Sequence, residues 1–437
     1  MGRSRRVGPG GVTHSAAQTP ILVLGLAGLS MHHGALGAIR SAGRLGIPVF
    51  LAHASRRSPI DRSRYCCGSV VLPRDWRGDR VGLETLEILL NYGARHHGTM
   101  LLAVDDAGAM FVDDHGAALA EVFLLPRQPR GLARSLADKR EMHRLCVAHD
   151  IPTPSATCPE SEADVREHAA TAAFPVVVKR IDASLPTDSP VSNVLVARDR
   201  EQLLAACGAI GSRVAPNVML QEYIPEAPRA NWMFNGYFDE HSRCRVAFTG
   251  QKLRQAPPDA GATTLGVCRS NPLLVRTTER FMQAVGYRGI VDMDYRLDPR
   301  DGRYKLLDVN PRIGSSFRLF VAADGKDVLQ AMYLDLTGRS APTPTEQQEG
   351  RRWIVEPQDL QSSIAHMRDG GLKLRDWLGS LRHVDEAAWW TLEDPAPFCA
   401  MSTSLLANRA RRHIQRARGH IGLRRPGSPP VSEGAGG

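Results

Sequence analysis

The first part of the chain alternates short apolar runs with stretches of helical pattern. ILVLGLAG at 21–28 and IPVFLAH at 47–53 are continuous apolar runs, as is typical of strands buried on both faces of a parallel sheet. Further short apolar runs follow, separated by helical stretches such as Gly82–Gly93. Strand alternating with helix at this pace predicts an open parallel α/β sheet over residues 20–130.

The segment 131–341 has a different texture, in which strands and helices are mixed. FPVVVKR at 174–180 and VMLQEYIP at 218–225 predict strands, and residues 288–312 predict a β-hairpin with its turn near Arg300. The segment is therefore of α+β character.

The ends of the chain differ again from the body. Residues 342–403 hold four of the six tryptophans and predict a small, mostly helical extension that packs on the body. Residues 1–19 and 404–437 are basic and polar, and we expect both to be disordered. Apolar residues recur at helical spacing from Leu406 to Ile421. This leaves open a basic amphipathic helix that makes weak contact with an anionic surface.

The positive charge of the chain is confined to its two ends. The formal net charge is +9 over 437 residues, and 43% of the residues are hydrophobic, which is enough for a substantial core. Residues 1–20 carry three arginines and no acid, and residues 404–437 carry seven arginines and one acid. The body between them is neutral, which argues against a specific nucleic-acid partner.

The cysteines and the apolar runs favour a cytoplasmic location. The eight cysteines form no CxxC pair, which favours reduced thiols over disulfides or zinc. The run PILVLGLAGL is too short to span a bilayer, and no apolar stretch directly follows the N-terminal arginines. We therefore expect neither a membrane helix nor a secretory signal.

The predicted hairpin carries an acidic patch. Because side chains alternate along a strand, Asp292, Asp294 and Arg296 share one face. Asp308 and Asn310 share a face of the returning strand, and the expected turn places residues 292 and 308 roughly opposite each other. Adjacent carboxylates repel, and a hard cation such as Mg²⁺ or Mn²⁺ relieves the repulsion. On spacing alone, a solvent-facing acidic hairpin is an equal alternative.

Two lysines and one short segment suit a nucleotide. Lys179 ends an apolar strand, where its ammonium can meet a phosphate as a point charge. Lys139 opens a helix ahead of IPTP, and the main chain of QEYI at 221–224 can read an adenine edge. Taken singly, these features are better explained as a strand-edge lysine, a helix start and a strand end.

Taken in order, these motifs resemble the ATP-grasp superfamily. The order is DK-helix-PTP, PVVVK, QEYIP, a carboxylate strand and DVNPR, and it spans roughly residues 20–340. More specifically, the chain is similar to the carboxylate–amine ligases of that superfamily. The resemblance implies a Rossmann-like pre-ATP-grasp domain at 20–130 that binds no dinucleotide, a two-lobed ATP-grasp domain at 131–341, and the helical extension at 342–403.

The resemblance also implies roles for single residues. Two lysines would hold the phosphates of ATP, and four residues would frame adenine, with main-chain contacts from Glu222 and Ile224. These ATP ligands are Lys139, Lys179, Gln221, Glu222, Tyr223 and Ile224. Asp294 and Asp308 would bind the metal, joined by Asn310, and Arg312 would stabilise the phosphoryl or acyl-phosphate group.

The sequence departs from the family pattern in two places. The usual glycine-rich phosphate loop is replaced by IDASLPTDSPVSN, which contains no glycine, so hydroxyl donors would have to serve. Those hydroxyls belong to Ser184, Thr187, Ser189 and Ser192. Aspartate also replaces the commoner glutamate at position 308, which puts the metal geometry in doubt.

A second basic strand is the last candidate. Lys252 and Arg254 alternate onto one face, and the resemblance implies that this stretch approaches the γ-phosphate and the acceptor as catalytic residues. A cationic face in solvent is an equal alternative.

The expected function is therefore that of an enzyme, an ATP- and Mg²⁺-dependent ligase. It would join a small-molecule carboxylate to an amine through an acyl phosphate and release ADP and phosphate. Two alternatives stay open, a non-catalytic nucleotide-binding scaffold and a ligase that uses a thiol acceptor. The sequence identifies neither substrate and leaves the oligomeric state open.

Overall fold

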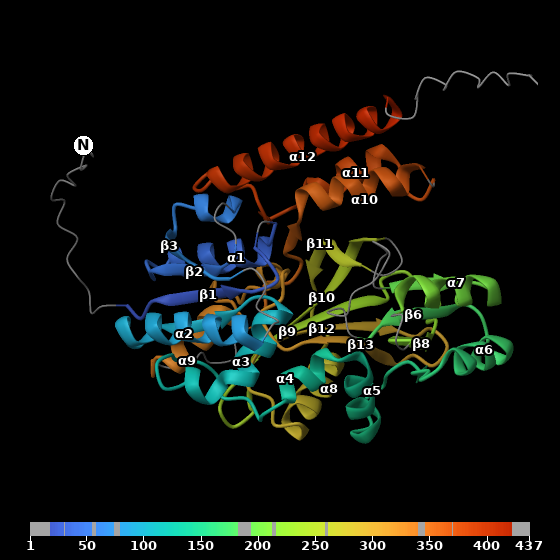
Figure 1. Ribbon diagram of the computed structural model, residues 1–437, viewed down its shortest axis with the longest axis horizontal. Coiled ribbons are helices and arrows are strands. Elements are labelled where there is room, and N and C mark those ends of the chain that lie inside the picture. The colour runs from blue at the N-terminus through green and yellow to red at the C-terminus, as the bar shows by residue number, and fades with distance from the viewer. Residues whose placement is uncertain are drawn as a thin grey trace, which may run out of the picture.

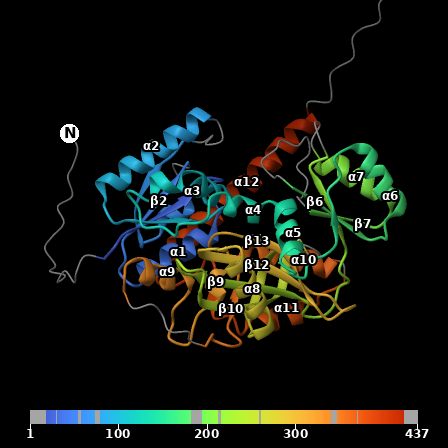
Figure 2. The same cartoon turned by 90° about the horizontal axis from the view of Figure 1, so that it is seen from below.

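The computed structural model arranges the chain around three β-sheets (Figure 1). It describes residues 18–29, 31–54, 58–73, 79–181, 194–211, 216–257, 261–339, 346–368 and 370–421. Seen from below, the first sheet with its helices and a small third sheet flank a large central sheet (Figure 2). No described helix is long and apolar enough to cross a membrane.

The N-terminal sheet is parallel, as the alternating pattern predicted. Its strand order is β3-β2-β1-β4, and its strands are β1 (Ile21–Gly25), β2 (Val49–His53), β3 (Cys66–Val71) and β4 (Met100–Ala103). The associated helices are α1 (His33–Gly43), η1 (Pro59–Arg62), α2 (Asp79–Arg95) and α3 (Asp106–Leu119). All five residues of β1 are buried, which explains its unbroken apolar run.

The small sheet is antiparallel and carries the two candidate nucleotide strands. Its order is β5-β8-β6-β7, with β5 (Ala156–Thr157), β6 (Val176–Arg180), β7 (Val194–Ala197) and β8 (Val218–Glu222). The helices of this region are α4 (Leu132–Ala137), α5 (Lys139–Ala148), α6 (Glu162–Thr171) and α7 (Arg200–Ile210). The side chain of Asp138 caps α5 by accepting from the amides of Arg140 and Glu141, both at 2.9 Å.

The central sheet has seven strands in the order β13-β12-β9-β10-β11-β14-β15. They are β9 (Asn231–Phe238), β10 (Cys244–Ala256), β11 (Ala262–Cys268), β12 (Gly289–Leu297), β13 (Tyr304–Asn310), β14 (Arg352–Ile354) and β15 (Glu386–Ala387). Helices α8 (Pro272–Ala284) and α9 (Val328–Leu336) and the short η2 (Phe317–Leu319) accompany it. The predicted hairpin is confirmed, because β12 and β13 pair antiparallel.

The C-terminal extension is more than a helical appendage. It forms α10 (Glu356–Arg368), α11 (Leu374–Leu381) and α12 (Ala396–Ile421), but it also adds β14 and β15 to the central sheet. The prediction of disorder from residue 404 is wrong as far as Ile421, because α12 continues to that residue and runs along the top of the molecule (Figure 1). Residues 1–17 and 422–437 lie outside the described part of the chain.

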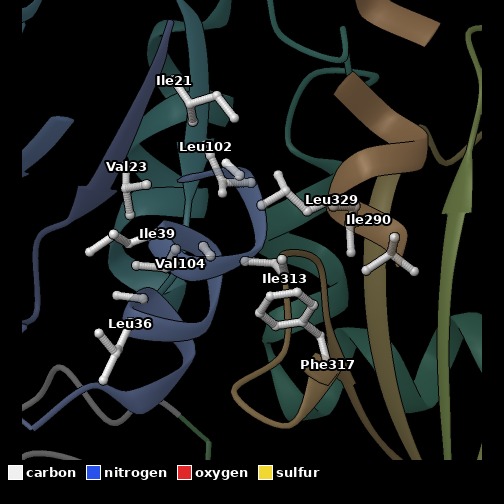
Figure 3. Close-up of a cluster of buried hydrophobic side chains, with 14 of the residues drawn as sticks. Ile21, Val23, Leu36, Ile39, Leu102, Val104, Ile290, Ile313, Phe317 and Leu329 are labelled. Carbon is white, nitrogen blue, oxygen red and sulfur yellow. The ribbon is translucent and has the colours of Figure 1, made fainter. Parts of the chain in front are cut away.

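One hydrophobic core joins the N-terminal sheet to the central sheet. Leu36 and Ile39 of α1 are buried in the same cluster as Ile313, Phe317 and Leu329 (Figure 3). Because both sheets share this core, their relative position is fixed, and so is the edge where they meet. The functional groups described below lie along that edge.

A buried ion pair ties the extension to the N-terminal sheet. The Nε of Arg40 lies 3.0 Å from Asp394, and both side chains are almost fully buried. Asp394 also accepts from the Ser63 hydroxyl at 2.7 Å and from the amide of Arg64 at 2.9 Å. The cluster explains why the extension docks in one position.

Asp394→Asn is expected to destabilise the fold by about 3 kcal/mol, because it leaves the Arg40 charge buried without its carboxylate. The measurement is chemical denaturation of wild type and variant. Glu393→Gln is the matched control, since its pair with Arg44 is partly exposed and should contribute about 0–1 kcal/mol. Equal stability of wild type and Asp394→Asn would contradict the assigned role.

Candidate active site

A cavity of about 1260 Å³ lies where the three sheets meet. It is larger than a typical pocket for a drug-sized ligand, so it has room for a nucleotide and a second small molecule. Eleven of the twelve residues predicted from the sequence line it: Lys139, Lys179, Gln221, Glu222, Tyr223, Ile224, Lys252, Asp294, Asp308, Asn310 and Arg312. The structure therefore brings them together, while their individual roles stay predictions.

The acidic patch is formed by adjacent strands of the hairpin. Asp294 pairs in register with Asp308, and Asp292 pairs with Asn310. The prediction that residues 292 and 308 are opposite is therefore wrong by two positions. The register shifts at this point because Leu306 pairs with Tyr295 while Asp308 pairs with Asp294, so Leu307 is an extra residue in β13.

Lysines already contact both carboxylates. Lys139 forms an ion pair with Asp308, and the Nζ of Lys252 lies 2.7 Å from Asp294. Each lysine thus neutralises one member of a pair that would otherwise repel. Any divalent cation that binds these oxygens must compete with the two ammonium groups.

The oxygen donors fit a small hard cation that also contacts phosphate. Asp294, Asp308 and Asn310 offer two carboxylates and an amide from neighbouring strands, the ligand type that Mg²⁺ prefers when phosphates complete its shell. Among the described residues, no group of three or more His, Cys, Asp or Glu side chains is set to hold a metal.

Asp292 lies deeper than the other two carboxylates. Burial, followed by the charge of Asp294, raises the pKa of Asp292 to about 6. Its carboxyl group packs against Gly314, where an added Cβ would lie 2.6 Å from either carboxyl oxygen. The glycine of DVNPRIGSS is therefore required by the close approach of Asp292.

Lys179 is a half-buried lysine at the same edge. Its Nζ donates to the carbonyl of Leu307 at 3.2 Å, the extra residue of β13. Burial, with a smaller contribution from the charge of Lys139, lowers the pKa of Lys179 to about 7. Burial also lowers the pKa of Lys139. A half-buried pair of lysines of this kind is stabilised by an incoming polyanion.

The pKa of Lys179 can be tested by its reactivity. We expect half-maximal acetylation by trace acetic anhydride near pH 7, since below that pH the amine is protonated and unreactive. The partly exposed Lys326 is the control, and near neutral pH Lys179 should react about 10³ times faster than an ordinary lysine. Mass spectrometry gives both rates. A midpoint near pH 10 for Lys179 would contradict the shift.

The candidate adenine segment begins in the last two residues of β8 and continues just beyond it. Gln221 is buried, whereas the side chain of Glu222 forms ion pairs with Lys305 at 2.9 Å and Arg300 at 3.0 Å. The amide of Glu222 donates to the carbonyl of Ser155 at 2.9 Å. Because that amide already donates to Ser155, an adenine ring would have to bind other main-chain groups of residues 221–224.

Arg312 bridges the N-terminal and central sheets. Its Nε donates to Asp106 at 2.8 Å, and one terminal nitrogen donates to the Asn310 side chain at 3.0 Å. Asp106 lines the cavity, whereas its neighbour Asp105 caps α3 by accepting from the amide of Gly108 at 2.7 Å. Both residues follow β4, where a cleft-lining or a capping role is expected, but the contact of Asp106 with Arg312 was not predicted because it spans more than 200 residues of sequence.

Arg254 is the predicted site residue that the structure places elsewhere. Its guanidinium is buried against Asp359, with contacts of 2.7 and 2.9 Å, and it also donates to Ser380. The reason is a bulge: Lys252 pairs with Gly266 and Arg254 with the adjacent residue of β11. Residues 252 and 254 therefore face opposite sides of the sheet. The prediction that they share one face is wrong, and Arg254 does not line the cavity.

Two further predictions cannot be placed. The four hydroxyl residues of the proposed phosphate loop lie in 182–193, which is outside the described residues. Residues 258–260, which follow β10, are also outside them.

The chain resembles known ligases in sequence and in fold. It is 26% identical over 259 residues to a D-aspartate ligase of Enterococcus faecium (strain Aus0004), a match that covers 56% of this chain and 61% of the relative. The chain thus spans less than two thirds of that relative's length. No protein-family model matches it.

Solved structures of two ligases share the fold. An L-amino acid ligase from Bacillus licheniformis matches with a TM-score of 0.55 at 15% identity, covering 74% of this chain and 75% of that one. The N5-carboxyaminoimidazole synthetase from Staphylococcus aureus in complex with ADP matches with a TM-score of 0.60 at 12% identity, covering 80% and 86%. The predicted fold class is confirmed as a fold: a parallel N-terminal sheet is followed by two further sheets, in an arrangement shared with these solved structures.

Proposed function

We propose that the protein is an ATP-dependent ligase that joins a carboxylate to an amine through an acyl phosphate. One observation carries the proposal: three lysines and two carboxylates line one cavity. Lys139 pairs with Asp308 and Lys252 with Asp294, while Lys179 donates to the carbonyl of Leu307, next to Asp308. Phosphoryl transfer requires cations that bind the phosphates and, beside them, oxygen ligands that hold a metal ion.

The nucleotide would lie between the small sheet and the central sheet. Lys179 and Lys139 would bind its phosphates, and Asp294, Asp308 and Asn310 would hold Mg²⁺. When bound, this ion would neutralise phosphate charge and orient the phosphates. Lys139 and Lys252 would then turn from the carboxylates toward the phosphate oxygens.

The chemistry would proceed in two balanced steps. A substrate carboxylate oxygen attacks the γ-phosphorus, the bond from that phosphorus to the ADP oxygen breaks, and an acyl phosphate forms. An amine then attacks the acyl carbon, phosphate leaves with the bonding electron pair, and the nitrogen loses a proton. Arg312, held by Asp106 and Asn310, is placed to bind the charged acyl phosphate.

The substrate pair is best sought among amino acids. The relative in sequence is a D-aspartate ligase, and one fold neighbour is an L-amino acid ligase. The part of the cavity beside α3 is lined by Asp106, Asp114 and His115. Both aspartates are paired with arginines of the same lining, Asp106 with Arg312 and Asp114 with Arg134, so an arriving protonated amine would compete with these guanidinium groups.

The test is an ADP-release screen of amino acids and small carboxylates, supplied in pairs with ATP and Mg²⁺. D-Aspartate, L-amino acids and thiols are included, and products are identified by mass spectrometry. An amide formed in step with ADP and phosphate supports the proposal. A thioester product would change the acceptor class, and ATP binding without substrate-dependent ADP release would overturn the proposal in favour of a scaffold.

A further inference from the structure

Arg296 is a buried cation that lines the cavity and stacks on an aromatic ring. The residue is only 8% exposed, and its Nε is buried with no hydrogen-bond partner among the described residues. The guanidinium lies over the ring of Tyr223, 5.7 Å from the ring centroid. Within the described part of the chain, no carboxylate forms an ion pair with Arg296.

Three other buried arginines of the described residues are paired with carboxylates, and a fourth, Arg180, donates from its Nε to the carbonyl of Ile210 at 3.2 Å. Arg40 binds Asp394, Arg254 binds Asp359, and Arg318 binds Asp327. Burying an unpaired charge is expensive, so such a group is normally neutralised by a partner. The cation–π contact with Tyr223 compensates only part of that cost. Arg296 has neither a carboxylate nor a carbonyl partner among the described residues, and it lines the cavity, which indicates that its partner is a ligand.

The position of Arg296 on β12 identifies the part of the ligand that it would meet. Residues 292, 294 and 296 share one face, and β12 pairs regularly with β9 through this stretch, with Arg296 opposite Asn231. Two residues of a strand span about 7 Å. Arg296 therefore lies one such step from Asp294, with Tyr223 of the candidate adenine segment on its other side.

We propose that Arg296 binds the α-phosphate of the nucleotide. The inference rests on the proposed function, which places the β- and γ-phosphates at the metal carboxylates and adenine at residues 221–224. The ribose and α-phosphate must then occupy the space between them, and the α-phosphate is the anion in that space. The guanidinium pairs with phosphate oxygens through two parallel N–H donors. Arg296 thus adds a nucleotide contact that the sequence motifs did not include.

The experiment compares AMP with adenosine, which differ only in the α-phosphate. Each is titrated as a competitor of ADP by calorimetry, without a divalent metal, against wild type, Arg296→Gln and Arg296→Lys. Arg303→Gln is the matched control, because it removes the same charge from an exposed position on the same hairpin. We expect Arg296→Gln to weaken AMP by about 10–100-fold and adenosine by less than twofold. The affinity of Arg296→Lys for AMP should lie between that of wild type and that of Arg296→Gln.

Thermal unfolding separates a ligand-binding role from a structural one. Because no described carboxylate pairs with Arg296, Arg296→Gln should unfold at the same temperature as wild type or a higher one in the absence of nucleotide. A lower unfolding temperature together with an unchanged ratio of AMP to adenosine affinity would overturn the inference. Equal losses of AMP and adenosine affinity would also overturn it, since they would place Arg296 on the base.

Failure of the proposed function gives a different result. If wild-type protein binds no ADP, both the ligase proposal and the role of Arg296 fail together. If wild type binds ADP and AMP but Arg296→Gln keeps the wild-type preference for AMP over adenosine, only the role of Arg296 is lost.

Discussion

Replacing Asp308 by asparagine is expected to lower kcat/KM for ATP by about 10³-fold or more. The carboxylate faces Asp294 across the hairpin, and removing it would take away one of two charged oxygen donors to the metal. A loss of that size corresponds to ~4 kcal/mol of transition-state stabilisation. The measurement is ADP release with the substrate pair that the screen identifies.

The fold should tolerate the change. The asparagine side chain is nearly isosteric with that of Asp308, and the wild-type side chain is partly exposed in the cavity, so stability should change by less than about 1 kcal/mol. Asp301→Asn is the control, because it removes an exposed carboxylate from the turn of the same hairpin. Full activity in Asp308→Asn would refute the metal assignment, and with it the ligase mechanism.

Regular alternation made the hairpin predictable from sequence. Strands with period-two patterns and a Pro-Arg-Asp-Gly turn specify a β-hairpin locally, so Asp294 and Asp308 could be placed on neighbouring strands. Bulges leave no comparable signal. The extra residues at 253 and 307 shift the register by one, and this shift moved Arg254 out of the site and Asp294 opposite Asp308.

Contacts between distant segments account for the other differences. Asp106 meets Arg312 across the boundary between two sheets, and only the packed core fixes that approach. Strands β14 and β15 are three and two residues long, too short to stand out within a helical pattern. In α12 the helical spacing of apolar residues was visible, but composition favoured disorder, and the helical pattern was the better guide as far as Ile421.

The three lysines of the site come from separate parts of the sequence and are brought together only in the folded protein. Lys139 opens helix α5, Lys179 lies near the end of β6, and Lys252 lies in β10 of another sheet, so none is distinctive alone. Folding places all three around one pair of aspartates. Their ordered occurrence carried the family resemblance, but the ion pairs depend on tertiary packing. The pair of Lys139 joins α5 to β13, and the pair of Lys252 joins β10 to β12 within the central sheet.

Lys252→Met is expected to have opposite effects on turnover and on metal binding. Its ammonium lies 2.7 Å from Asp294 and is almost fully buried, so it competes directly with a divalent cation for that carboxylate. Without nucleotide, the variant should therefore bind Mn²⁺ about tenfold more tightly, a difference of ~1.4 kcal/mol, as measured by electron paramagnetic resonance. Turnover should nevertheless fall about 10²–10³-fold, because the same lysine would stabilise charge on the transferred phosphoryl group.

The control separates competition from a general change in charge. Lys326→Met also removes a lysine from an aspartate pair, but that pair with Asp324 is partly exposed and remote from the cavity lining. It should leave both Mn²⁺ affinity and turnover unchanged. If Lys252→Met binds Mn²⁺ no better than wild type, then Lys252 does not restrain the metal carboxylates. In that case, replacement of a lysine ammonium by a metal ion at these carboxylates would not be part of nucleotide binding.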